Sequence, residues 1–265
     1  MIKLVACDLD GTLLNDDKRI APQTLQAIGR LAGRGVRFVI ASARPPRSVR
    51  HLYDQLHLNT LQINYNGALI WDQVAQLAVD HRPLPGLLAL EIIQFARAID
   101  KQVLVTCEIM DRWHTDRFDN TYSTATGELF GPDVIEPVEQ FCDGEVTKLL
   151  LLGPGTVMQA IRPQVLEHFG DRANVVCTEP ELLQIMEKSV SKAASLRRVV
   201  ERDGIGLDQV LAIGDGENDL EMLSECGIGA AVANAAPALK RAANWVAPRP
   251  NSLGVLDALQ RYCGV

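Results

Sequence analysis

The sequence predicts an α/β fold, a Rossmann-like, doubly wound parallel sheet with an inserted α+β domain. Short apolar runs alternate with amphipathic stretches in the first and last parts of the chain, the rhythm of parallel strands joined by crossover helices. Residues 84–187 do not continue this alternation. Because loops inside compact sheets usually have about 2 to 6 residues, this interruption is predicted to be an inserted cap domain in a discontinuous core of residues 1–83 and 188–265.

Apolar runs and helix-spaced apolar residues predict the elements of the first part. Strands are expected at residues 3–7, 36–41 and 61–65, and helices at 22–34 and 46–56. The first helix should end at Gly35, since glycine suits a helix C-terminus. Asn66 and Gly67 indicate a turn, so a hairpin is expected to follow through about residue 81.

The insert and the last part are read in the same way. In the insert we expect a helix to about residue 98, strands at 103–107, 146–152, 175–177 and 182–186, a helix at 156–169, and a polar aromatic stretch at 111–122. After it we expect helices at 191–202, 218–225, 237–243 and from 252, with strands at 210–213 and 229–233. The last part should therefore complete the first sheet.

The composition is that of a globular protein. The 265 residues include 47% hydrophobic and 22% charged side chains, a balance that argues against disorder. Apolar runs fall short of the roughly 18 residues of a membrane span, and the start shows no signal-peptide pattern, so we expect a cytoplasmic protein without a membrane partner. The net charge of −7 gives no general basic face for nucleic acid. The oligomeric state stays open.

Two aspartates directly follow the first predicted strand. Asp8 and Asp10, in the run DLDGT, stand where open α/β sheets bind ligands, outside the carboxyl ends of their strands. Both carboxylates leave the strand on the same side if its extension persists that far, and Gly11 lets the chain bend. The alternative is a solvated strand end or a helix cap.

A second acidic loop, GDGEND at residues 214–219, follows the strand predicted at 210–213. Its oxygen ligands suit a hard cation such as Mg2+ better than zinc, and its spacing does not match a calcium-binding EF-hand. The alternative is a turn in which Asn218 or Asp219 caps the next helix. The six cysteines show no CxxC spacing, so reduced thiols are expected and no zinc ribbon.

A hydroxyl and a cation complete the polar groups near strand ends. Ser42, Ala43 and Arg44 follow the strand predicted at 36–41, and Lys192 begins a predicted helix. A hydroxyl, backbone N–H groups and a lysine are what the oxygens of a phosphoryl group need. Each feature alone is weak, because turn hydroxyls and exposed lysines are common.

Together, the four motifs resemble those of the haloacid dehalogenase-like superfamily of aspartate-nucleophile phosphotransferases. The large insert between Ser42 and Lys192, with segments at 66–68, 234–235 and 251–255, is similar to the Cof-type sugar-phosphatase subfamily. The resemblance spans essentially the whole chain. The sequence departs from the family pattern at Ala43, Ala193, Val232 and Ala233, which puts substrate details in doubt more than the chemistry.

The resemblance implies a Mg2+-dependent phosphatase that hydrolyses a small phosphate ester, such as a sugar phosphate, through an aspartyl-phosphate. Asp8 would be the nucleophile and Asp10 the general acid and base. The metal would be held by Asp8, the Asp10 carbonyl and Asp215, supported by Asp219. The phosphate-site residues are Ser42, the Ala43 N–H, Lys192 and Asn218, with Thr12 orienting Asp10, and the substrate contacts are Arg44, Arg47 and Asn66.

The insert would act as a lid that selects the leaving group, with 111–114 as its most polar aromatic cluster or as an ordinary surface strand. Three other functions compete. A hexose phosphomutase shares a similar cap and motif set. A phosphoacceptor signalling module would also use clustered aspartates, but in a chain of different length and motif order. The third is a catalytically silent binding protein.

Overall fold

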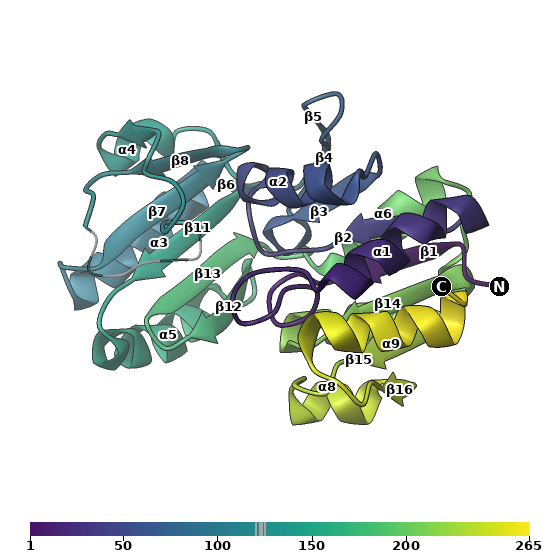
Figure 1. The fold of residues 1–265 in the computed structure, drawn as a ribbon. Coiled ribbons are helices and arrows are strands. Elements are labelled where there is room, and N and C mark those ends of the chain that lie inside the picture. Colours follow the sequence, from purple (N-terminus) through teal and green to yellow (C-terminus); the bar gives the residue numbers. More distant parts are fainter. Residues whose placement is uncertain (120, 122–123, 125) are drawn as a thin grey trace. The chain divides into compact units, whose positions relative to one another are not determined.

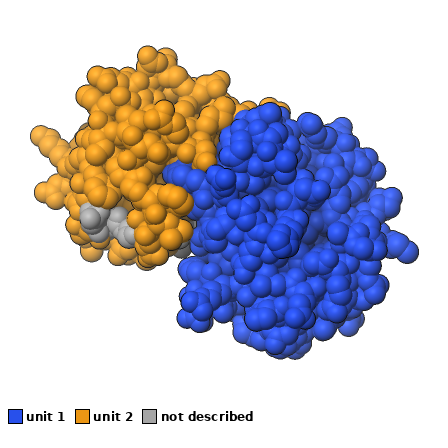
Figure 2. All heavy atoms as spheres, turned by 45° about the horizontal axis from the view of Figure 1, so that its top comes forward, with its two compact units in different colours: residues 1–79, 191–265 blue, residues 80–190 orange. Residues whose placement is uncertain are grey.

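The computed structural model describes residues 1–119, 121, 124 and 126–265. Asn120 and Tyr122, which belong to the predicted polar aromatic stretch, lie outside the described residues. The chain forms two compact units, one of residues 1–79 and 191–265 and the other of residues 80–190 (Figure 2). The boundaries of the units lie at 79/80 and 190/191, within a few residues of the 83/84 and 187/188 expected from the sequence.

The first unit is built on a parallel sheet of five strands. Their order is β16 (Trp245–Val246), β15 (Ile228–Ala231), β14 (Val210–Gly214), β1 (Leu4–Cys7) and β2 (Arg37–Ile40). Every neighbouring pair is parallel. The chain proceeds from β1 to β2 on one side and from β14 to β16 on the other, so the strand order reverses between β1 and β14. The predicted doubly wound parallel core is confirmed.

Helices cover this sheet and exclude water from its central strand. The helices of the first unit are α1 (Pro22–Leu31), α2 (Pro46–Leu56), α6 (Lys192–Arg202), α7 (Leu220–Glu225), α8 (Pro237–Ala242) and α9 (Asn251–Cys263). Helices α1 and α9 pack against each other (Figure 1), as do α6 and α7. All four residues of β1 are fully buried, as expected for a parallel strand covered on both faces.

The third predicted strand belongs to a different sheet. β3 (Leu61–Asn64) pairs antiparallel with β4 (Leu69–Asp72), and β5 (Leu77–His81) completes a three-stranded sheet. An isolated parallel bridge between Ala41 and Ile63 connects β3 to the segment after β2, and the Ser42 N–H donates to the Ile63 carbonyl at 2.8 Å. The predicted turn at Asn66 and Gly67 is a single 3-10 turn, residues 65–67.

The second unit contains a six-stranded sheet that is mostly antiparallel. Its order is β12 (Ala173–Glu179), β13 (Leu182–Glu187), β11 (Lys148–Leu152), β7 (Leu104–Ile109), β8 (Arg112–Thr115) and β9 (Val134–Ile135), with only β8 and β9 parallel. Helices α3 (Gly86–Ile99) and α5 (Gly155–Phe169) and the short α4 (Val138–Phe141) accompany it, and β6 (Leu84–Pro85) pairs with β10 (Glu145–Val146). The unit has its own apolar core.

Within residues 1–119, 121, 124 and 126–265, none of the helices combines the length and the hydropathy that a membrane span needs. All six cysteines are free thiols, four of them buried.

Candidate active site

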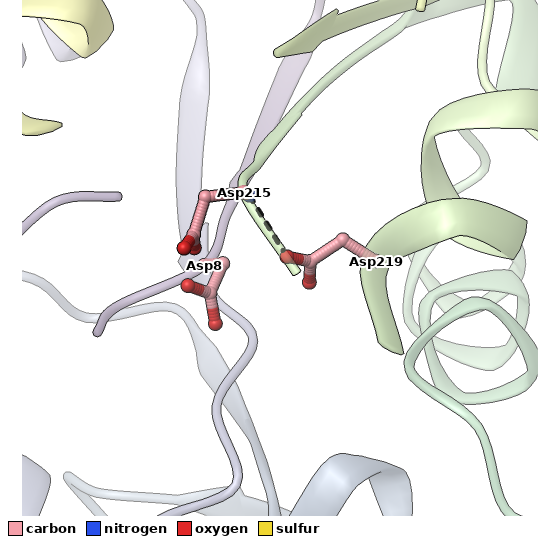
Figure 3. Close-up of side chains that lie close together, drawn as sticks. All are labelled: Asp8, Asp215 and Asp219. Carbon is pink, nitrogen blue, oxygen red and sulfur yellow. Dashed lines mark hydrogen bonds between the residues drawn. The ribbon is translucent and has the colours of Figure 1, made fainter. Parts of the chain in front are cut away.

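The two acidic loops meet where the strand order reverses. Asp8 follows β1 and Asp215 follows β14, and these neighbouring strands are in register, with Cys7 beside Ile213. The Asp8 N–H donates to the Ile213 carbonyl at 2.9 Å, so the pairing continues to the first acid. Carboxylate oxygens of Asp8, Asp215 and Asp219 all lie within 4.8 Å of one another (Figure 3). The crevice at such a reversal is where open α/β sheets bind ligands.

Lys192 provides the positive charge in direct contact with this cluster. As the first residue of α6 it follows Ser191, whose hydroxyl caps the helix by accepting the Ala194 N–H at 3.0 Å. The Lys192 ammonium donates to Asp8 Oδ1 at 2.5 Å and to Asp219 Oδ1 at 2.7 Å. Its side chain is completely inaccessible to water. A buried ammonium requires such partners, because desolvating an unpaired charge is costly.

One ammonium does not balance three carboxylates. Burial raises the pKa of Asp8 well above its ordinary value; Lys192 opposes this rise, and the charges of Asp219 and Asp215 add to it. Burial also raises the pKa of Asp215. Burial works against the charge of Lys192, but Asp219 and Asp8 outweigh it and raise the pKa of the ammonium group. The cluster therefore has an excess of negative charge that a further cation would relieve.

Asp219 is fully buried and both of its oxygens have donors. Oδ1 accepts from Lys192, and Oδ2 accepts the N–H groups of Asp215 and Gly216 at 3.1 and 3.0 Å. The contact with Asp215 is the dashed line in Figure 3. Asp219 thus holds the loop that carries Asp215. Asp8 and Asp215 offer the carboxylate oxygens best placed for a metal ion, and an all-oxygen donor set with excess negative charge fits Mg2+.

Thr12 differs from the expectation that it orients Asp10. Its buried hydroxyl donates to Asp215 Oδ1 at 2.7 Å. The reason is the turn at Gly11, which has a φ of +81° and brings the chain so close that a β-carbon there would lie 2.4 Å from Asp215 Oδ2. Only glycine adopts this conformation at little cost and leaves this space. The turn therefore directs Thr12 to Asp215.

Asp10 is paired with two cations. Arg44 makes a bidentate contact with the Asp10 carboxylate, with Nε 2.7 Å from Oδ2 and Nη2 2.6 Å from Oδ1. The Lys18 ammonium lies 3.0 Å from Oδ1. Burial acts to raise the pKa of Asp10, but the hydrogen bond and charge of Arg44, with those of Lys18, lower it below its ordinary value. Arg44, expected at the substrate, contacts Asp10 here. Lys18 is a further partner of Asp10 that the sequence motifs did not single out.

Of the remaining predicted phosphate residues, Ser42 and Ala43 follow β2, and Asn218 lies in the loop after β14. Ser42 is buried, and its hydroxyl oxygen accepts the Arg44 N–H at 3.1 Å. Ala43 lies half-buried between these two residues. Asn218 donates through Nδ2 to Asn66 Oδ1 at 3.0 Å.

Two further side-chain hydrogen bonds involve Arg47 and Asn234. Arg47 donates to the Tyr65 hydroxyl at 3.5 Å. Asn234, which was noticed only as part of a family-like segment, donates from its amide to the Gly11 carbonyl at 2.7 Å. It thereby supports the turn between Asp10 and Thr12. No local pattern marks such a contact, because the two residues are 223 positions apart.

Comparison with known proteins agrees with this fold. Residues 5–259 match the family described as haloacid dehalogenase-like hydrolase. A 5-amino-6-(5-phospho-D-ribitylamino)uracil phosphatase of Bacillus subtilis is 29% identical over 271 residues, which cover 98% of this chain and 97% of that protein.

Solved structures of similar proteins cover nearly the whole chain. A haloacid dehalogenase-like hydrolase from Bacteroides thetaiotaomicron superposes with a TM-score of 0.87 at 27% identity, covering 98% of this chain and 99% of its own. A sugar phosphatase of subclass IIB gives a TM-score of 0.84 with 99% of each chain covered, but at 20% identity it supports the fold alone.

The chain therefore belongs to the haloacid dehalogenase-like hydrolase family, and the resemblance drawn from its motifs is confirmed. Since relatives of matching length are phosphatases by name, the prediction that it is an enzyme of the phosphatase class is confirmed as well.

Proposed function

We propose that this phosphatase hydrolyses small phosphate monoesters in two steps, through an aspartyl-phosphate on Asp8. The observation that carries the proposal is the contact of one buried carboxylate, Asp8, with a fully buried ammonium, Lys192, beside Asp215. An anionic nucleophile and an anionic phosphate repel each other, at roughly 332/(εr) kcal/mol per pair of unit charges. Positive charge at this position is therefore needed for attack.

Asp8, Asp215 and the main-chain carbonyl of Asp10 would hold Mg2+. When bound, the ion neutralises the cluster and polarises a phosphoryl oxygen. Thr12 orients Asp215 through its hydroxyl, and Asp219 accepts the Asp215 N–H and so fixes the backbone of the same loop. These supporting contacts keep the two ligand carboxylates in place before substrate arrives, which limits reorganisation during the reaction.

The protein groups divide the chemistry among them. The Asp8 carboxylate attacks phosphorus, and Asp10 gives a proton to the leaving alkoxide and then takes one from the attacking water. Ser42, the Ala43 N–H, Lys192 and Asn218 hold the phosphoryl oxygens. Arg44 keeps Asp10 ionised in the contact described above. For the first step we propose that a substrate phosphate draws Arg44 away, so that Asp10 can carry the proton.

The insert, predicted as residues 84–187, is proposed to select the leaving group. It has its own sheet and apolar core, and its exposed loops provide variable side chains without changing the chemistry of the first unit. The Bacillus subtilis relative is named for a phosphate ester of a ribityl chain. Sugar and polyol phosphates are therefore the substrate class to test first.

The test is a Mg2+-dependent release of inorganic phosphate from p-nitrophenyl phosphate and from a panel of sugar and polyol phosphates. Asp8→Asn should abolish turnover and leave the fold intact, while Asp208→Asn, an exposed control, should retain it. Substantial hydrolysis by Asp8→Asn at saturating Mg2+ would contradict the nucleophile assignment. Recovery of an isomerised sugar phosphate in place of free phosphate would identify a phosphomutase instead.

A further inference from the structure

The turn at residues 65–67 has an unusual backbone. Tyr65, Asn66 and Gly67 have successive positive φ angles of 51°, 56° and 106°. Two consecutive non-glycine residues in this region are uncommon, and such strain persists only where surrounding contacts hold it. All three residues are buried. Contacts around the turn must therefore hold its backbone in this conformation.

The turn joins two segments that are distant in sequence. The Asn66 N–H donates to the Ser42 carbonyl at 3.0 Å. The Gly67 carbonyl accepts the Ser195 hydroxyl at 2.7 Å, and a β-carbon on Gly67 would lie 2.3 Å from the Ser191 carbonyl oxygen. The turn is thus wedged between the end of β2 and the first turn of α6, which carries Lys192. Its backbone position is fixed from both sides.

The side chain of Asn66 makes a third connection, to Asn218. Asn66 Oδ1 accepts a hydrogen bond from Asn218 Nδ2 at 3.0 Å. On its other side the Asn218 oxygen packs against Gly216, where a β-carbon would lie 2.6 Å from Oδ1. The hydrogen bond to Asn66 sets which way the Asn218 amide is turned, because only the amide nitrogen can donate. The side-chain nitrogen of Asn218 therefore points toward Asn66, whose backbone N–H donates to the Ser42 carbonyl.

We infer that Asn66 is a positioning residue, which fixes the Asn218 amide so that its second N–H is directed to the phosphate. This inference rests on the proposed function, in which Asn218 and Ser42 bind phosphoryl oxygens. The orientation matters because an amide presents a donor on one side and an acceptor on the other. Without the Asn66 acceptor, Asn218 can rotate and present its oxygen to an anion, which weakens phosphate binding.

The test removes the side-chain amide of Asn66 and keeps the backbone conformation of the turn. Asn66→Gly suits the positive φ and deletes only the side chain. We expect the inhibition constant of inorganic phosphate, and KM with it, to rise roughly tenfold, as for loss of one hydrogen bond to a charged group, with a smaller change in kcat. Gln76→Gly, at a φ of 54° in the exposed turn between β4 and β5, is the matched control and should match the wild type.

A double-mutant cycle shows whether Asn66 acts through Asn218. Asn218→Ala should weaken phosphate binding by itself, and adding Asn66→Gly should weaken it little further, because no amide remains to be oriented. A merely structural role would instead give additive losses. Gly216→Ala displaces the same amide from its other side and should raise the same inhibition constant, which gives a second route if Asn66→Gly does not fold.

The outcomes distinguish this inference from the proposed function. If the wild type releases no phosphate from any monoester with Mg2+, the proposed function fails. If the wild type is active and folded Asn66→Gly binds inorganic phosphate as the wild type does, or if the cycle is additive, the positioning role is overturned and the proposed function stands. Where Asn66→Gly does not fold, wild-type phosphate binding by Gly216→Ala overturns it in the same way.

Discussion

Lys192 and Asp8 are 184 residues apart in sequence, yet the lysine ammonium lies 2.5 Å from Asp8 Oδ1. The ammonium is shared with Asp219, and neither Lys192 nor Asp219 has a water-accessible side chain. The contact links the residue after strand β1 to the second residue of the chain after residues 80–190. The candidate site is therefore formed by both segments of the first unit.

Replacing Lys192 with methionine should destabilise the protein by about 3–5 kcal/mol, because two buried carboxylates lose their cation. Urea unfolding without metal measures this loss. Lys3→Met, at an exposed position, should change the free energy of unfolding by no more than about 0.5 kcal/mol. Equal stability of the two variants would show that the buried pair does not need the ammonium.

Thr12→Val should weaken metal binding. The substitution removes the hydroxyl that donates to Asp215 Oδ1, and loss of a partner that orients a metal ligand commonly costs about 10- to 100-fold in affinity. The measurement is the Mg2+ concentration that gives half-maximal phosphate release. Thr12→Ser keeps the hydroxyl, and Thr24→Val removes a buried hydroxyl that donates to the Ser252 carbonyl away from the acidic cluster. An unchanged Mg2+ requirement in Thr12→Val would refute this role.

Sequence patterns located the helices other than the four-residue α4, and most strands, because their signals are local. Helix α2 spans Pro46–Leu56, the range expected from the sequence, since proline begins it and apolar residues repeat at helical spacing. Strand β16 was not predicted, because its two residues are too few to show a period. The antiparallel pairing of β3 with β4 follows the turn expected at Asn66 and Gly67, and β5 completes that sheet.

The meeting of Asp8, Asp215 and Lys192 was predictable from the sequence, whereas the partners of Thr12 and Arg44 were not. Asp8, Asp215 and Lys192 stand beside strand or helix ends, so the topology alone brings them together. The partner of Thr12 depends on the turn at Gly11. The grip of Arg44 on Asp10 likewise depends on loop geometry, which periodicity does not encode.

The stability of the protein should depend on pH through His81. Its Nε2 lies 3.0 Å from the hydroxyl oxygen of Thr147, which already accepts the Met110 N–H, so the hydroxyl hydrogen can be donated to a neutral imidazole. Burial lowers the pKa of His81 below its ordinary value of 6.5, although the charges of Glu145 and Asp80 act in the opposite direction. The folded protein therefore disfavours the protonated ring.

The sign of this effect follows from which state binds the proton more tightly. The unfolded chain takes up a proton at the ordinary pKa, above that of folded His81, so the stabilisation is present above about pH 6.5 and lost as the pH falls below it. When denaturant unfolding is measured from roughly pH 7.5 to roughly pH 5, the free energy of unfolding should fall less in His81→Gln than in the wild type. His168→Gln, at an exposed position, should follow the wild type; identical curves for all three proteins would contradict the prediction.

Mg2+ should stabilise the wild type against heat, because it relieves the repulsion among Asp8, Asp215 and Asp219 in the folded state and has no such site in the unfolded chain. At a free concentration about 100 times the dissociation constant, linkage gives about 2.7 kcal/mol. Asp215→Asn removes one ligand charge, so its Tm should hardly respond to Mg2+, whereas exposed Asp208→Asn should respond as the wild type does. Calorimetric scans with EDTA and with Mg2+ measure the difference. A Tm increase of equal size in Asp215→Asn would mean that the ion stabilises the fold from another site.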